Sequence, residues 1–221
     1  MTMNTSSIEL PRLTPVSPEV RLYEVTKRCL DIAASLSGLL LLSPLLLLVC
    51  MAVRLDSPGS PLFFQTRVGK NGKEFRCWKF RSMYKDAEAR KAALLAENEM
   101  AGGVTFKIEN DPRITRVGRV IRKLSIDELP QLFNVLNGDM TLVGPRPPVP
   151  TEVAQYNWYQ MRRLDVTPGI TCIWQVTGRS SIPFEQQVEL DLEYIQRRSL
   201  WLDIKLLLAT VPAVLTARGA C

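Results

Sequence analysis

Hydrophobic and polar positions divide the 221-residue chain into stretches of different character. Residues 1–19 hold Ser, Thr and three prolines with little periodicity, which is typical of a mobile tail. An apolar run without any charge follows between Asp31 and Arg54, and as a helix it could cover the roughly 30 Å hydrocarbon core of a bilayer. Residues 55–221 mix charged and apolar positions, so we expect a membrane-anchoring segment over residues 20–54 and one globular domain after it.

Two features of the apolar run favour a helix-break-helix that enters and leaves one face of the membrane. Ser43-Pro44 interrupts the run, and proline removes a backbone donor from a helix while a serine hydroxyl can satisfy a freed carbonyl. Both flanks are basic, so the positive-inside rule puts both ends on the cytoplasmic side. A straight span and a buried helix of a globular protein are the alternatives. The basic flanking residues are Arg21, Lys27 and Arg28 before the run, and Arg54, Arg67, Lys70 and Lys73 after it.

The globular part is predicted to be mainly α-helical with a small β-hairpin, an α+β fold. Asn71-Gly72 lies between two runs rich in β-branched and aromatic residues, a strong hairpin signal. A surface helix is expected over 84–100, with an ion pair between Asp86 and Arg90. A basic helix is expected from Asp111 as N-cap, with Pro112 at its first position.

The C-terminal stretch 191–215 begins polar and ends apolar. Its apolar part is too short to span a bilayer and contains Asp203 and Lys205. Helices that lie in the membrane interface, with Trp201 at headgroup depth, fit this pattern, and a core helix is the alternative.

Composition narrows the possible chemistry, because the chain has no histidine. Ser-His-Asp and Cys-His catalytic groups and histidine zinc sites are therefore excluded. Five widely spaced cysteines without a C-x-x-C motif indicate neither a disulfide framework nor a thiolate metal cage, and favour a reducing, cytoplasmic compartment. The net charge of +6 suits anionic partners such as phosphates, nucleic acid or acidic lipids.

An adjacent carboxylate pair, Asp127-Glu128, is the strongest local candidate for catalysis. Ser125 and Glu128 match a capping box, but Pro130 would then lie too deep in the helix; with Asp127 as N-cap, Pro130 falls at the third position, where no N–H is needed. That register places both carboxylates at a helix N-terminus, which also attracts phosphate. An ionised Asp can attack phosphorus without a base, and Glu128 is a suitable oxygen ligand for Mg²⁺. Capping combined with surface charge is the alternative for such a dipeptide.

Further cations occur in turn-rich segments. Arg146 lies between Pro145 and Pro147, a stiff setting suited to a bidentate phosphate contact or to a rigid surface turn. Arg179 follows Gly178 in a similar setting. The basic residues of the helix after Asp111 fit a phosphate or lipid-headgroup role as well as a solvated face. Neither G-x-x-x-x-G-K-[ST] nor G-x-G-x-x-G occurs, so the usual nucleotide-binding loops are absent from the sequence.

Several motifs together resemble the bacterial sugar transferase family, the monotopic phosphoglycosyl transferases that start lipid-linked glycan synthesis. The resemblance runs in order from about Lys27 to the C-terminus. The motifs that carry it are KFRSM (79–83), NDPRITRVGR (110–119), IRKLSIDELPQLFNVLNGDMTLVGPRPP (121–148), TPGITCIWQVTGRS (167–180) and LDLEYI…SLWLDIKLLL (190–208).

The resemblance implies transfer of a sugar 1-phosphate from a UDP-sugar to polyprenyl (undecaprenyl) phosphate, with release of UMP. In the family the Asp of the dyad is the nucleophile and the Glu binds Mg²⁺, which match Asp127 and Glu128. The family's substrate-binding and phosphate-binding positions match Lys79, Arg122, Arg146, Arg179 and Asp191. Its Ser-Pro break in a re-entrant membrane helix matches Ser43-Pro44.

The resemblance also implies a place in the cell, a membrane enzyme at the cytoplasmic face of the bacterial inner membrane that acts in exopolysaccharide, capsule or other glycoconjugate synthesis. Many members have Gly where this chain has Cys172. Larger members carry a multi-span N-terminal region, so we expect this chain to be a minimal catalytic form. A homo-oligomer is a further possible partner state. A non-catalytic scaffold for anionic lipids and assembly proteins is the alternative function. Nucleic acid is not an expected partner, because aromatic residues are not interleaved with the cations.

Overall fold

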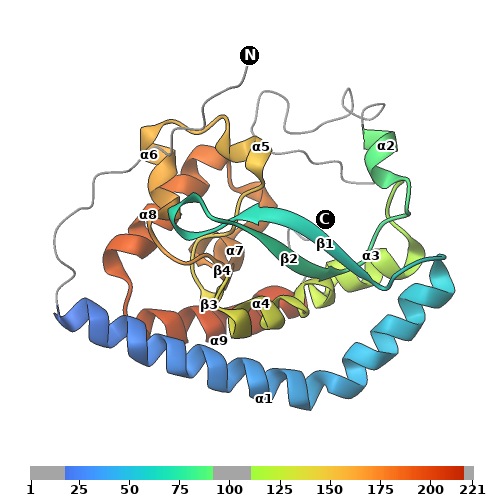
Figure 1. Ribbon diagram of the computed structural model, residues 1–221, viewed down its shortest axis with the longest axis horizontal. Helices are drawn as coiled ribbons and strands as arrows, with labels where there is room; N and C mark the ends of the chain where they lie inside the picture. The colour runs from blue at the N-terminus through green and yellow to red at the C-terminus, as the bar shows by residue number, and fades with distance from the viewer. Residues whose placement is uncertain (1–17, 92–110, 217–221) are drawn as a thin grey trace.

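A long, bent helix, α1 (Pro18–Asp56, 39 residues), forms one side of the protein in the computed structural model, which describes residues 18–91 and 111–216 (Figure 1). The helix changes direction partway along its length. The Ser43 hydroxyl donates to the carbonyl of Leu40 at 2.8 Å, which is the carbonyl that Pro44, lacking an N–H, leaves free. The predicted break at Ser43-Pro44 is therefore a bend within one helix. Most of the predicted tail lies outside the described residues.

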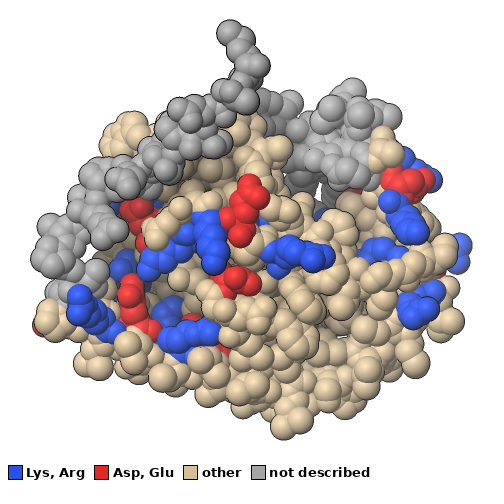
Figure 2. Space-filling model, viewed as in Figure 1, with Lys and Arg blue, Asp and Glu red and all other residues tan. Residues whose placement is uncertain are grey.

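The two arms of α1, the part before Ser43-Pro44 and the part after it, pack against the same body of the protein. On the first arm, the Asp31 carboxylate accepts hydrogen bonds from the Thr141 hydroxyl and the Leu142 N–H. On the second arm, Val49 and Val53 pack into a buried cluster with other elements. The lower edge of the molecule, where α1 bends, shows no charged side chains in Figure 2. The exposed apolar residues of this stretch are Leu36, Leu40, Leu41, Leu45, Leu47, Leu48 and Met51.

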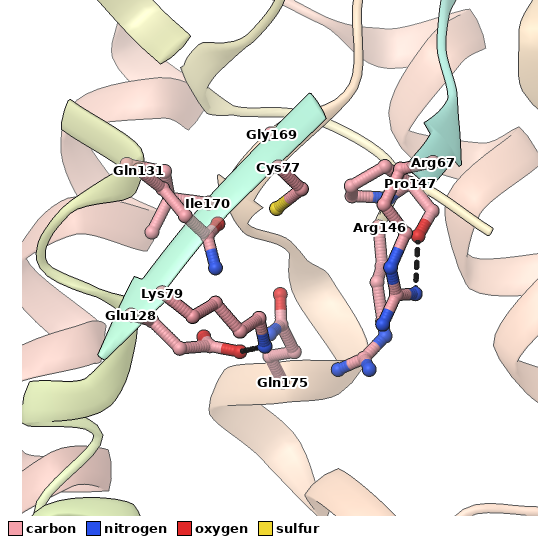
Figure 3. A pocket seen from close by; sticks show the side chains of 10 residues that line it. All are labelled: Arg67, Cys77, Lys79, Glu128, Gln131, Arg146, Pro147, Gly169, Ile170 and Gln175. Carbon is pink, nitrogen blue, oxygen red and sulfur yellow. Dashed lines mark hydrogen bonds and ion pairs between the residues drawn. The ribbon is translucent and has the colours of Figure 1, made fainter. Parts of the chain in front are cut away.

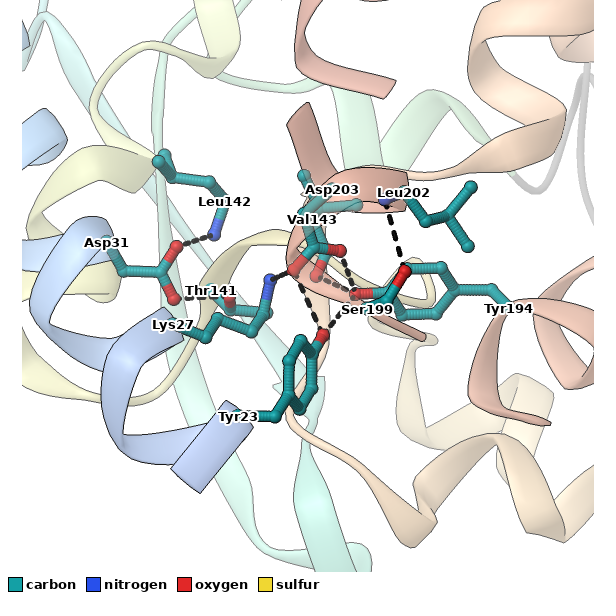
Figure 4. Close-up of polar contacts among 10 residues, drawn as sticks. All are labelled: Tyr23, Lys27, Asp31, Thr141, Leu142, Val143, Tyr194, Ser199, Leu202 and Asp203. Atoms are coloured by element: carbon teal, nitrogen blue, oxygen red, sulfur yellow. Dashed lines mark hydrogen bonds and ion pairs between the residues drawn. The ribbon is translucent and has the colours of Figure 1, made fainter. Parts of the chain in front are cut away.

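A buried polar cluster joins the first arm of α1 to the C-terminal helices α8 (Phe184–Arg197) and α9 (Leu200–Thr216) (Figure 4). The Asp203 carboxylate lies 2.7 Å from Lys27 Nζ and accepts a 3.0 Å hydrogen bond from the Tyr23 hydroxyl. The Tyr194 hydroxyl lies 2.7 Å from the other oxygen of the same carboxylate. Asp203 is therefore a buried structural partner of α1, in a stretch that the sequence predicted to be interfacial.

The predicted hairpin is confirmed. Strands β1 (Leu62–Val68) and β2 (Glu74–Phe80) pair antiparallel around the 3₁₀ turn η1 (Lys70–Gly72). Asn71 and Gly72 have φ values of 58° and 76°, a left-handed conformation that Asn and Gly adopt at little cost.

A second, parallel sheet was not predicted. Strands β3 (Thr141–Val143) and β4 (Gly169–Thr171) pair over only a few residues, too short for an alternating pattern to be recognised. A Cβ atom at Gly169 would lie 2.0 Å from the Gly144 nitrogen, so the strands can approach only with glycine at this position. The connection between the two strands contains α5 (Pro150–Val153), α6 (Trp158–Met161) and η4 (Arg162–Asp165).

The basic helix α3 (Arg116–Lys123) begins later than predicted. Thr115 is its N-cap, and the Thr115 hydroxyl accepts the Gly118 N–H at 2.9 Å. Asp111 is not the cap of this helix; its carboxylate accepts the Arg113 N–H at 2.9 Å and forms a buried ion pair with the Arg113 guanidinium at 2.6 Å. The Asp111 carboxylate thus binds both the backbone and the side chain of Arg113, and the first turn of α3 is capped by Thr115 instead.

Of the predicted surface helix over 84–100, the structure describes α2 (Ala87–Lys91), and the rest lies outside the described residues. The predicted Asp86–Arg90 ion pair forms at 2.5 Å. Helix α9 buries Leu206 and exposes a set of apolar side chains, so membrane contact of this helix remains a prediction. The exposed apolar side chains of α9 are Trp201, Ile204, Leu207, Leu208, Val211 and Leu215.

Candidate active site

The carboxylate pair lies in η3 (Ile126–Glu128), a single 3₁₀ turn between α3 and α4 (Gln131–Asn137). Neither capping register predicted from the sequence is correct. Pro130 is the residue that precedes α4, and Ser125 adopts a left-handed conformation at φ 53° with no capping bond. Because α4 is short and Asp127 does not cap it, the attraction of a helix N-terminus for phosphate does not explain this site.

Side-chain hydrogen bonds hold α4 against β2 and so bring the dyad to Lys79. Asn134 is completely buried; its amide nitrogen donates to the Arg76 carbonyl at 2.7 Å, and its oxygen accepts the Trp78 N–H at 2.9 Å. Lys79, the next residue of β2, places its Nζ 2.6 Å from Oε1 of Glu128. The two charged side chains are 16% and 21% exposed, so water screens this ion pair only partly.

Beside this ion pair is a small pocket, open to solvent and rich in positive charge (Figure 3). Its cationic residues are Arg67, Lys79 and Arg146, and Glu128 is the carboxylate among them. This excess of cations favours an anionic ligand. The remaining lining residues are Cys77, Gln131, Pro147, Gly169, Ile170 and Gln175.

Arg67 is a pocket residue that the sequence analysis counted only as a basic flank of the membrane segment. Its guanidinium donates to the Pro147 carbonyl at 2.8 Å and to the Gln65 side chain. Burial and then the charge of Arg146 lower its pKa to about 10. Arg67 therefore fixes the proline-rich loop that carries Arg146, and an anion in the pocket would relieve the repulsion between the two guanidinium groups.

The two carboxylates of the dyad differ in their affinity for a proton. Burial raises the pKa of Asp127 to about 6, and Lys79 and Arg122 oppose this rise. Burial would also raise the pKa of Glu128, but Lys79 and Arg146 hold it well below its usual range. Glu128 is thus a permanent anion at neutral pH, whereas Asp127 is a more basic carboxylate, which is the better property for a nucleophile.

The other predicted site residues are distributed around this pair. Arg122, in the last turn of α3, acts electrostatically on Asp127, and Arg179 reaches towards the Ser125 hydroxyl at 3.5 Å. Asp191 is completely buried on α8 and paired with Arg163 at 2.7 Å, so its carboxylate does not line the pocket. Substrate contact by Asp191 remains a prediction, to which the structure gives no direct support.

The dyad could hold a magnesium ion only together with other ligands. Among the described residues, no group of three or more acidic or cysteine side chains could hold a metal ion alone. Magnesium in proteins is commonly bound by one or two carboxylates together with substrate phosphates and water. One oxygen of Glu128 accepts a hydrogen bond from Lys79, and this carboxylate could provide such a ligand when a phosphate is present.

Comparison with known proteins identifies the family. The sequence profile of the bacterial sugar transferases matches residues 22–217. The chain is 50% identical to the galactosyl transferase CpsE of Streptococcus agalactiae, over 89% of this chain and 43% of that protein. It is 40% identical to the exopolysaccharide production protein ExoY of Rhizobium meliloti, over 89% of this chain and 88% of that protein. With the undecaprenyl-phosphate galactose phosphotransferase of Salmonella typhimurium it shares 44% identity, over 88% of this chain and 41% of that protein.

The chain thus spans less than half the length of the streptococcal and Salmonella proteins and most of the rhizobial one. In each comparison, the aligned part covers nearly all of this chain. The chain belongs to the bacterial sugar transferase family.

Proposed function

We propose that the protein transfers a sugar 1-phosphate from a UDP-sugar to polyprenyl phosphate and releases UMP. The observation that carries this proposal is the position of Glu128, paired with Lys79, in a pocket whose cations outnumber its carboxylates. Asp127 precedes Glu128 in the same turn, η3, and is itself not one of the residues that line the pocket. The printed name of the Salmonella relative, an undecaprenyl-phosphate galactose phosphotransferase, supports this substrate pair and makes UDP-galactose the first donor to test.

The reaction proceeds in two displacements at one phosphorus atom. The Asp127 carboxylate attacks the phosphorus that carries the sugar, the bond from that phosphorus to the bridging oxygen breaks, and UMP leaves with that oxygen. An oxygen of polyprenyl phosphate then attacks the same phosphorus, and the bond to Asp127 breaks. Both nucleophiles are anions, so no general base is required, which is consistent with a chain that lacks histidine.

The pocket cations make both displacements possible by offsetting the charge of the reactants. An Asp anion and a diphosphate repel each other, and Lys79 and Arg146 lie where they can stabilise the phosphate oxygens. Lys79 has a second effect, because it lowers the proton affinity of both dyad carboxylates. We further propose that Glu128 binds Mg²⁺ together with the substrate phosphates, where the ion would offset negative charge on the phosphate under attack.

The bent helix α1 supports a membrane location. The parts of α1 before and after the bend both pack against the same globular body. The charge-free stretch at the bend is exposed. We infer that this stretch enters one leaflet and returns, and that the exposed face of α9 lies in the interface. With basic residues flanking both arms, the globular body lies on the cytoplasmic face of the inner membrane.

A UMP-release assay tests this function. The purified protein is incubated with Mg²⁺, undecaprenyl phosphate and either UDP-galactose, UDP-glucose or their N-acetylated forms, and UMP and lipid-linked product are measured. We expect one donor to give both products in equal amounts. A non-catalytic scaffold would bind anionic liposomes without turning over any donor, and that result would contradict the proposal.

A further inference from the structure

Gln175, on helix α7 (Ile173–Thr177), lines the catalytic pocket but has no role in the reaction described above. In Figure 3 its side chain lies beside the Lys79–Glu128 ion pair, among the residues that line the same pocket. It is the side chain of α7 that lines the pocket, and with Gln131 it supplies a neutral amide where the other nitrogen donors are the cations Arg67, Lys79 and Arg146.

A hydrogen bond from Cys172 determines which end of the Gln175 amide faces the pocket. Cys172 immediately precedes α7, is completely buried, and its Sγ lies 3.1 Å from Oε1 of Gln175. The thiol is the donor and the amide oxygen is the acceptor. With its oxygen held by the thiol, the amide keeps the two N–H donors of its nitrogen for a ligand in the pocket that Gln175 lines.

The thiol is a dependable donor under physiological conditions. Burial and then the nearby Asp191 carboxylate raise the pKa of Cys172 well above its usual range. Cys172 therefore keeps its proton across the neutral range and continues to donate to Gln175. Its complete burial also keeps it out of contact with water.

We propose that Gln175 binds a phosphate oxygen of the UDP-sugar through its amide nitrogen, and that Cys172 is the positioning residue that holds the amide in this orientation. This inference rests on the proposed function and adds a substrate contact to it. A phosphate oxygen is the expected acceptor because Gln175 lines a pocket whose cations attract an anion, and its nitrogen is a donor. Arg67, Lys79 and Arg146 supply charge, while Gln175 supplies a directed, neutral hydrogen bond.

The test measures the KM for the donor, kcat, and inhibition by UDP, which has the phosphates but no sugar. Gln175→Ala should raise the KM of the donor and the inhibition constant of UDP by a similar factor, about tenfold for a hydrogen bond to a charged acceptor. Gln155→Ala, on the exposed side of the domain, is the matched control and should leave both constants unchanged.

The role of Cys172 is tested by combining substitutions. Cys172→Ala should raise both constants by about threefold, because the amide can then rotate, and Cys172→Ser should restore much of the loss. In a Gln175→Ala background, Cys172→Ala should have no further effect on either constant. A merely structural effect of the lost sulfur would instead persist in the double variant.

The possible outcomes separate this inference from the proposed function. If the unmodified protein turns over a donor while Gln175→Ala leaves the UDP inhibition constant unchanged, the inference is wrong and the proposed function stands. Equal effects of Cys172→Ala in both backgrounds would refute the positioning role. If the unmodified protein turns over no donor at all, both the inference and the proposed function are wrong.

Discussion

Replacing Lys79 with methionine separates two possible roles of this residue, charge compensation for the dyad and direct contact with substrate. Methionine retains an apolar stem of similar length but removes the charge that lies 2.6 Å from Glu128. Glu128 has a pKa well below its usual range and stays ionised at neutral pH even after a rise of one or two units. Asp127 is the sensitive group, because its pKa is already raised to about 6.

The expected size of the effect follows from the charge that Lys79 contributes. Loss of a nearby opposite charge raises the pKa of a carboxyl by about one unit at the lower end of the usual range. The pKa of Asp127 then rises from about 6 to about 7. At pH 6 the ionised fraction falls from about a half to about a tenth, roughly fivefold, whereas at pH 8.5 it is almost unchanged. Formation of the phosphosugar intermediate should follow these fractions, since only the ionised carboxylate attacks.

The assay is single-turnover UMP release between pH 5.5 and 9, with Lys79→Arg as the matched control that retains the charge. We expect the acid limb of the Lys79→Met profile to move up by about one pH unit, in addition to a loss of rate at every pH from the missing phosphate contact. A loss of the same size at every pH, with the acid limb in its original place, would refute the electrostatic effect on Asp127 and leave substrate contact as the only role of Lys79.

Two other substitutions test the buried Arg163–Asp191 ion pair and the bend of α1 at Pro44. Arg163→Met leaves the buried Asp191 carboxylate without its 2.7 Å partner. We therefore expect the free energy of unfolding to fall by roughly 3–5 kcal/mol, measured as a fall in Tm. The control Arg197→Met breaks an exposed ion pair and should leave Tm nearly unchanged. Pro44→Ala should let α1 straighten, so that a membrane-impermeant maleimide labels the exposed Cys29 from the periplasmic side; equal periplasmic labelling of the unmodified protein would contradict the re-entrant topology.

Local features of the fold could be predicted from the sequence because neighbouring residues determine them. The Asn71-Gly72 turn needs only the left-handed preference of its own two residues, and the hairpin is present. The bend at Ser43-Pro44 likewise follows from the missing N–H of one proline and the hydroxyl before it. In both cases no distant contact is required to specify the backbone.

Features that depend on distant contacts were predicted wrongly or missed. The capping register of the dyad failed because Ser125 takes a left-handed conformation and its hydroxyl lies towards Arg179, which is remote in the sequence. Arg67 belongs to the pocket only because β1 pairs with β2 and its guanidinium reaches the Pro147 carbonyl. The proximity of Lys79 to Glu128 depends in the same way on α4 packing against β2, although the resemblance to the family had marked both residues.

The central claim, that Asp127 carries the sugar phosphate, is tested most directly by intact-mass spectrometry of the protein mixed with Mg²⁺ and the accepted UDP-sugar in the absence of polyprenyl phosphate. We expect an added mass equal to one sugar phosphate, located by peptide sequencing on Asp127, absent in Asp127→Asn, and lost when undecaprenyl phosphate is added. An adduct that persists in Asp127→Asn, or that is located on Glu128, would contradict the claim.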